Sequence, residues 1–139
     1  MSKDIIEVVE SLEDLEQVGP ATLEEIEKAQ EILGVKFADD FIQLLSKYKV
    51  LYAKNIEWMG LHEAEYVNLV KNTLHEKEVD KTAPADMYFI EDLGIDGLQT
   101  WQHESGAVYG RTRFYDDLEK LADSLVEYIE KYYDDDDEI

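Results

Sequence analysis

The sequence predicts an α+β fold, because three extended segments in series are flanked on both sides by helical patterns. The extended segments fill residues 87–109, which begin with an apolar run typical of a buried strand. A turn rich in Asp and Gly at 92–97 and a polar turn at 103–106 separate them. Three strands joined by short turns form a meander, and a meander can anchor a sheet.

Length and composition predict one domain. The 139 residues suit a single domain, which we place at 1–133 and which includes a helix at its N-terminal end. Residues 134–139 form an acidic, low-complexity tail that we expect to be disordered. The sequence has no Cys, no signal peptide and no apolar run near the roughly 20 residues that cross a bilayer. We therefore expect a cytoplasmic protein that does not act at a membrane.

Acidic residues dominate the charge of the chain. There are 34 Asp and Glu residues against 13 Lys and Arg residues, which gives a net charge of -21. Such a charge repels nucleic acid and anionic lipid, and it attracts cationic protein surfaces. We expect a protein partner and no nucleic acid. The alternative interpretation is that the acidity serves solubility alone.

The second helix has the clearest sequence signals. Thr22 and Glu25 form a capping box, in which each side chain accepts a hydrogen bond from the other residue's backbone N–H. Gly34 ends the helix, since Gly is favoured just after a helical C-terminus. Asp39 or Asp40 then begins the next helix as its N-cap.

Apolar spacing predicts three further helices and two short strands. Residues 4–18 and 63–77 carry apolar side chains three and four positions apart, as an amphipathic helix does. A last helix opens at 115–117 and runs to the end of the domain. The segments 50–52 and 55–59 are predicted to be short strands, because they are apolar and bounded by turn residues.

Residue patterns for catalysis or metal binding are missing from the sequence. There is no Cys nucleophile and no Gly-x-Ser-x-Gly elbow, and His75-Glu76 lacks the second His of a zinc protease. Glu91, Asp92 and Asp96 place three oxygen ligands close together, but their spacing does not match a calcium loop. With 34 acidic residues, carboxylate pairs arise by chance. We expect no catalytic residue, no metal and no cofactor.

Tryptophans on the strands allow two interpretations. Gln99 and Trp101 point to one face of the predicted hairpin, and Leu98 and Thr100 to the other. Trp and Tyr are favoured at protein interfaces, so the Trp101 face could form part of a contact surface. The alternative is that both tryptophans belong to the core, which is the favoured interpretation for Trp58, while the two interpretations are balanced for Trp101.

The order of features resembles that of a known family, the SUKH superfamily, whose members are similar to the yeast cell-wall synthesis regulator. The resemblance spans about residues 22–132. It is carried by Glu24-Glu25-Ile26, Ile32-Leu33-Gly34-Val35, Lys36-Phe37-Ala38-Asp39-Asp40-Phe41, Leu44-Leu45-Ser46-Lys47-Tyr48, Gly97, Trp101-Gln102, Ser105-Gly106, Val108-Tyr109 and the closing helix at 118–132. Ala38 stands where the family usually has Pro, and Lys49-Val50 replaces a common Gly-containing turn.

The resemblance implies a central mixed, mostly antiparallel sheet with flanking helices. In bacteria it implies an immunity protein, which binds and blocks a toxin that is often a nuclease. The acidity of the chain is compatible with covering a basic active site.

Our first hypothesis is therefore a non-enzymatic immunity protein that occludes the active site of a cognate, basic nuclease toxin. A regulatory or scaffold module that binds a host protein is the alternative, and a hydrolase that uses carboxylates is a third possibility. A monomer and a homodimer are both compatible with the sequence. The residues predicted to bind the partner, around one end of the sheet, are Glu57, Trp58, Glu91, Asp92, Asp96, Trp101 and Glu104.

Overall fold

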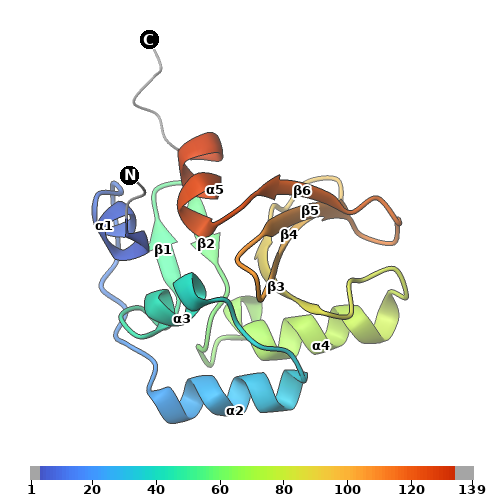
Figure 1. The fold of residues 1–139 in the computed structure, drawn as a ribbon, viewed down its shortest axis with the longest axis horizontal. Coiled ribbons are helices and arrows are strands. Elements are labelled where there is room, and N and C mark those ends of the chain that lie inside the picture. The colour runs from blue at the N-terminus through green and yellow to red at the C-terminus, as the bar shows by residue number, and fades with distance from the viewer. Residues whose placement is uncertain (1–3, 134–139) are drawn as a thin grey trace.

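A computed structural model describes residues 4–133 of the protein (Figure 1). The elements in chain order are α1 (Ile5–Glu10), α2 (Leu23–Leu33), α3 (Asp39–Leu45), β1 (Leu51–Ala53), β2 (Ile56–Trp58), the 3-10 helix η1 (Glu65–Val67), α4 (Leu69–Val79), β3 (Met87–Asp92), β4 (Leu98–His103), β5 (Val108–Thr112), β6 (Glu119–Ala122) and α5 (Leu125–Tyr132). The predicted α+β class is confirmed. The tail predicted at 134–139 lies outside the described residues.

Two antiparallel sheets form the β part of the fold. The larger sheet has the strand order β3-β4-β5-β6, and β1 and β2 form a separate hairpin. The hairpin joins the larger sheet at one point, where Met59 N donates to Ile90 O over 2.7 Å. In Figure 1, α4 runs along one side of the larger sheet and α2 lies beside α4, while α5 packs near the hairpin on the other side.

The signals that predicted α2 act as expected. Thr22 N donates to Glu25 Oε1 over 2.8 Å, and Glu25 N donates to Thr22 Oγ1 over 3.1 Å, so the capping box is complete. Gly34 ends the helix with a φ of 69° in the left-handed region, where a residue with a Cβ would be strained.

Helix α1 ends earlier than predicted, at Glu10 rather than near Val18. The segment that follows α1 forms backbone hydrogen bonds with the β1–β2 hairpin instead. Glu16 N donates to Tyr52 O over 2.9 Å, and Lys54 N donates to Glu13 O over 2.8 Å. These bonds to a neighbouring chain segment replace the bonds that a longer helix would have made within itself, although the apolar spacing fitted a helix.

The predicted N-cap of α3 is also wrong. Ala38 occupies the cap position without a side-chain bond, and Asp39 and Asp40 lie in the first turn. Asp40 turns inward: its Oδ2 accepts from Leu125 N over 2.9 Å at the start of α5, and its Oδ1 accepts from Gln102 Nε2 over 3.1 Å. The carboxylate therefore ties three elements together rather than capping its own helix.

The C-terminal region contains a strand that the sequence did not predict. The closing helix was expected to open at 115–117, but residues 119–122 form β6, and α5 covers only Leu125–Tyr132. Pairing of Tyr109 with Lys120 and of Val108 with Ala122 attaches β6 to β5. Within the helix predicted at 63–77, residues 65–67 form η1 and α4 begins only at Leu69.

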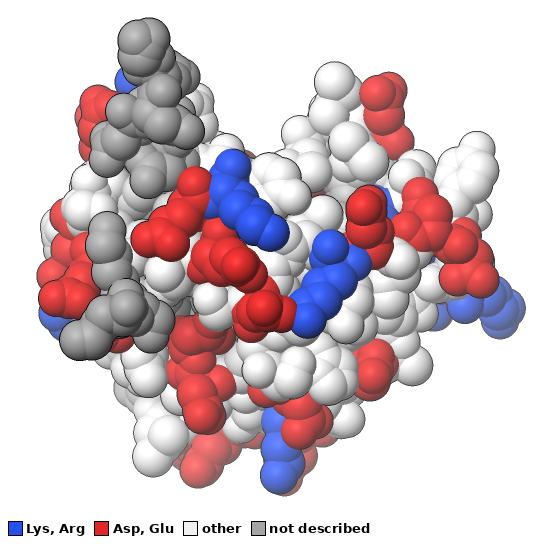
Figure 2. Space-filling view, turned by 45° about the horizontal axis from the view of Figure 1, so that its top comes forward, with Lys and Arg blue, Asp and Glu red and all other residues white. Residues whose placement is uncertain are grey.

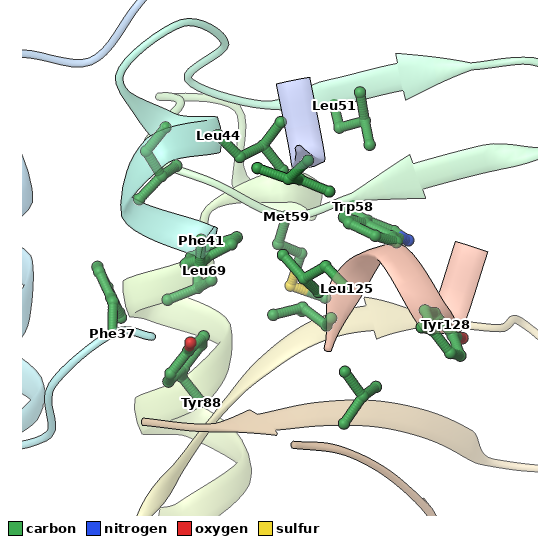
Figure 3. Packing of buried hydrophobic residues seen from close by; sticks show 14 of the residues in the cluster. Phe37, Phe41, Leu44, Leu51, Trp58, Met59, Leu69, Tyr88, Leu125 and Tyr128 are labelled. Carbon is green, nitrogen blue, oxygen red and sulfur yellow. The ribbon is translucent and has the colours of Figure 1, made fainter. Parts of the chain in front are cut away.

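The core lies between the sheet, α3 and α5 (Figure 3). Phe37, Phe41 and Tyr88 contact one another with ring centroids 4.8–5.3 Å apart. The Tyr88 hydroxyl accepts from Ala38 N over 2.9 Å and donates to Gln102 Oε1 over 2.6 Å, so this buried polar group is satisfied. Among residues 4–133, no helix is long and apolar enough to cross a membrane.

Candidate functional site

Three of the seven residues predicted to bind a partner are buried. Trp58 and Trp101 have no exposed surface, and Glu91 is 3% exposed. Gln99 and Trp101 do share one face of β4, as predicted, but that face is covered: Gln99 Nε2 donates to Glu76 Oε1 of α4 over 2.9 Å. Trp101 stacks on Phe89 with ring centroids 5.2 Å apart. Direct contact of these three side chains with a partner is therefore blocked by other parts of the fold.

Glu91 belongs to a buried cluster beneath α5. Its carboxylate accepts from the Tyr128 hydroxyl over 2.7 Å and from the hydroxyl of Tyr133. Burial raises the pKa of Glu91 above its ordinary value, and the hydrogen bonds from the two tyrosines offset that effect only in part. Trp58 Nε1 also acts to lower this pKa, yet its geometry falls short of a hydrogen bond and leaves the indole N–H unpartnered.

The four exposed members of the predicted site do not lie together. Asp92 ends β3 and Asp96 lies in the β3–β4 turn that follows it, whereas Glu104 lies in the β4–β5 turn. In the antiparallel register Asp92 pairs with Gln99 and Met87 pairs with His103, which puts the two turns at opposite ends of the sheet. Glu57 lies on β2, in the other sheet. The prediction that all seven residues surround one end of the sheet is wrong.

A buried network of charges, which the sequence analysis missed, anchors the loop after β5. The Arg111 guanidinium donates to Asp80 Oδ2 over 2.8 Å, to Thr82 Oγ1 over 2.6 Å and to Gln99 Oε1 over 2.7 Å. The side chains of Arg111 and Asp80 are 1% and 2% exposed. Their two charges cancel, and each is bonded to several partners, as a buried ion pair requires.

A second ion pair extends the network toward the surface. Arg113 Nε donates to Glu76 Oε1 over 2.8 Å, and the same oxygen accepts from Gln99. Trp101 Nε1 donates to Gln99 Oε1 over 2.9 Å. A sequence signal for this network existed: two of the 13 basic residues stand two positions apart in Arg111-Thr112-Arg113, where strand alternation puts both on one face.

The exposed charge is acidic and widely spread. Figure 2 shows Asp and Glu side chains over much of the visible face, with fewer Lys and Arg side chains set among them. Within residues 4–133, no group of three or more His, Asp or Glu residues is arranged to hold a metal ion. A shallow groove of about 350 Å³ lies between α2 and the start of α4, and its apolar lining is Ala29, Ile32, Leu61 and Val70.

The chain matches the model of a known protein family over most of its length. The family model SUKH_5, described as SMI1-KNR4 cell-wall, matches residues 3–134, which is nearly the whole chain. No curated protein matches the sequence.

Proposed function

The chain belongs to the SMI1-KNR4 cell-wall (SUKH) family, and we propose that it is an immunity protein that binds a cognate bacterial toxin and neutralises it. The family is associated with immunity proteins. The observation that favours this function is the net charge of -21 on a chain of 139 residues. A charge of this size suits a partner whose working surface is basic, such as a nuclease that holds a polyanion.

The proposed mechanism is occlusion. The immunity protein covers the cationic cleft in which the toxin would bind nucleic acid, so substrate is excluded without any bond being made or broken. Of the predicted partner-binding residues, Glu57, Asp92, Asp96 and Glu104 are exposed and available for such contacts. The protein acts in the cytoplasm and needs no cofactor in this mechanism.

The function is tested by searching the genes beside this one for a candidate toxin and co-expressing that toxin with the protein. Cells that carry both genes are expected to survive, while cells with the toxin gene alone stop growing. The purified proteins are expected to form a complex whose association rate falls steeply between low and high salt, because long-range attraction is screened. Absence of both protection and complex would refute the proposal.

The family description, which names a cell-wall protein, favours a second candidate function. In this alternative the chain is a regulatory or scaffold module that binds a host protein. A gene deletion distinguishes the two functions. Deletion of an immunity gene harms the cell only when the toxin is present, whereas deletion of a regulator has an effect in cells that lack the toxin gene.

A further inference from the structure

Exposed apolar side chains gather on two loops at one end of the larger sheet. One loop joins β3 to β4 and the other joins β5 to β6 (Figure 1). We call their exposed apolar side chains, together with that of Leu98 at the start of β4, the paired-loop surface. Its members, with their exposed fractions, are Leu93 (41%), Ile95 (60%), Leu98 (38%), Phe114 (56%), Tyr115 (64%) and Leu118 (41%).

We propose that the paired-loop surface docks the toxin, which presents to it a basic protein surface that encloses an apolar pocket. This inference rests on the immunity function proposed above and names the surface that performs it.

Backbone bonds hold the two loops side by side. Leu98 pairs with Thr112 at the end of the β4–β5 ladder. Just beyond this pair, Arg113 N donates to Gly97 O over 2.8 Å. The apolar side chains of both loops can therefore contact one partner at the same time.

The β5–β6 loop is fixed in one conformation before any partner binds. The buried pair of Arg111 and Asp80 reaches its backbone twice, because Arg111 donates to Tyr115 O over 3.3 Å and Asp80 Oδ2 accepts from Phe114 N over 2.7 Å. Thr112 N donates to Asp117 Oδ1 over 2.8 Å. A pre-ordered loop loses less conformational entropy on binding, so more of its contact energy appears as affinity.

Phe114 is held in an unfavourable backbone conformation that leaves its ring exposed. Its φ is 73°, in the left-handed region that a bulky residue rarely adopts. The guanidinium carbon of Arg113 lies 4.6 Å from the ring centroid and supports one side of the ring. Strained residues of this kind are concentrated at functional sites, and the hydrophobic core does not use this ring.

The charges around the surface indicate what it binds. Its exposed acidic neighbours at the end of β3, in the two loops and at the start of β6 are Asp92, Asp96, Asp116, Asp117 and Glu119. The basic side chains at the end of β5 and in the β5–β6 loop, Arg111 and Arg113, are already committed to ion pairs. An apolar centre with an acidic rim fits a cationic protein, because tight interfaces place aromatic anchors at the centre and polar groups around them. The same acids repel an anionic lipid surface.

Matched substitutions test this surface. Ile95→Ser and Tyr115→Ala each remove an exposed apolar side chain from it. Ile32→Ser and Tyr66→Ala are the controls, because these residues are similarly exposed, at 50% and 66%, but lie on α2 and η1. The probe is the purified candidate toxin, titrated calorimetrically against each folded variant.

Each of the two substitutions in the surface is expected to raise the Kd for the toxin by about 30-fold, as the loss of a hot-spot residue does. Each control substitution is expected to raise this Kd by less than about 3-fold. If Ile95→Ser and Tyr115→Ala bind the toxin as tightly as wild type does, the assignment of the surface is overturned, but the proposed function is not. Wild-type protein that neither binds nor protects would overturn the proposed function and this inference with it.

Discussion

Replacing Arg111 by Met removes the positive charge at the centre of the buried network while keeping a long apolar side chain. Asp80 would then be a buried carboxylate, 2% exposed, without its ionic partner. Removing one member of a buried pair costs about 3–5 kcal/mol, because the remaining charge is left uncompensated. A domain of this size has a free energy of unfolding of about 5–15 kcal/mol, so the substitution would remove a large part of the protein's stability.

The pH dependence of this loss identifies its cause. Burial alone would raise the pKa of the Asp80 carboxyl, but hydrogen bonds from Thr82, Arg111 and the Phe114 backbone N–H together hold it well below its ordinary value. A lowered folded-state pKa gives stability that is present above the ordinary value near 3.9 and is lost as the pH falls through the folded-state pKa. The difference between wild type and Arg111→Met is therefore largest at neutral pH, and it narrows as the pH falls and the buried Asp80 carboxyl of the variant becomes protonated.

Urea unfolding measures both effects. With a slope of about 2 kcal/mol per molar urea, a loss of 4 kcal/mol lowers the midpoint by about 2 M. Lys47→Met is the control, since its ion pair with Glu10 is exposed at both ends, at 56% and 46% of the two side chains, and its urea midpoint should stay close to that of wild type. An Arg111→Met protein within about 1 kcal/mol of wild type at pH 7 would refute the role given to the network.

Three other substitutions test separate parts of the structure, each by urea unfolding. Burial raises the pKa of Glu91, so its ionisation destabilises the fold as the pH rises above the ordinary value near 4.3. Glu91→Gln should be more stable than wild type by about 1 kcal/mol at pH 8 and equal to it near pH 4, and a deficit at pH 8 would contradict this. A Cβ at Gly60 would lie 1.9 Å from the backbone O of Lys49, so Gly60→Ala should lose about 3 kcal/mol or fail to fold, whereas near-native stability would show that the backbone segments at Lys49 and Gly60 can move apart. Gly34→Ala has free space but a positive φ, so it should lose only about 1 kcal/mol, and a larger loss would mean that the space is not free.

Local signals predicted the elements whose ends are fixed by their own residues. The capping box at Thr22 and the glycine at position 34 set the limits of α2 correctly. The three strands of the 87–109 meander were also predicted correctly, because apolar runs and tight turns alternate there. In these segments the local preferences and the tertiary contacts favour the same structure.

Distant contacts decided the segments that were predicted wrongly. Residues 119–122 carry apolar spacing compatible with a helix, yet they pair with β5 because the edge of the sheet offers backbone partners. The Asp40 carboxylate accepts a hydrogen bond from the first backbone N–H of α5 rather than from one of its own helix, α3. No local sequence pattern shows that Leu125 N lies beside Asp40. The burial of Trp101 depends in the same way on α4 lying over its face of β4.

The candidate site was only partly predictable for the same reason. Acidity and the residues Asp92 and Asp96 were visible in the sequence, and both residues border the paired-loop surface. Of the apolar residues in the β5–β6 loop, Tyr115 and Leu118 fall in the first turn of the helix predicted to open at 115–117, and Phe114 falls in the connection before it. Their exposure follows from a strand at 119–122 and from a buried ion pair between residues 31 positions apart.

Amide hydrogen exchange of the protein with and without the toxin tests the central claim most directly. Exchange is expected to slow on toxin binding at residues 93–98 and 113–118, and to stay unchanged along the groove between α2 and α4. Slower exchange in that groove with both loops unaffected would contradict the account, because the toxin would then bind a different face of the protein.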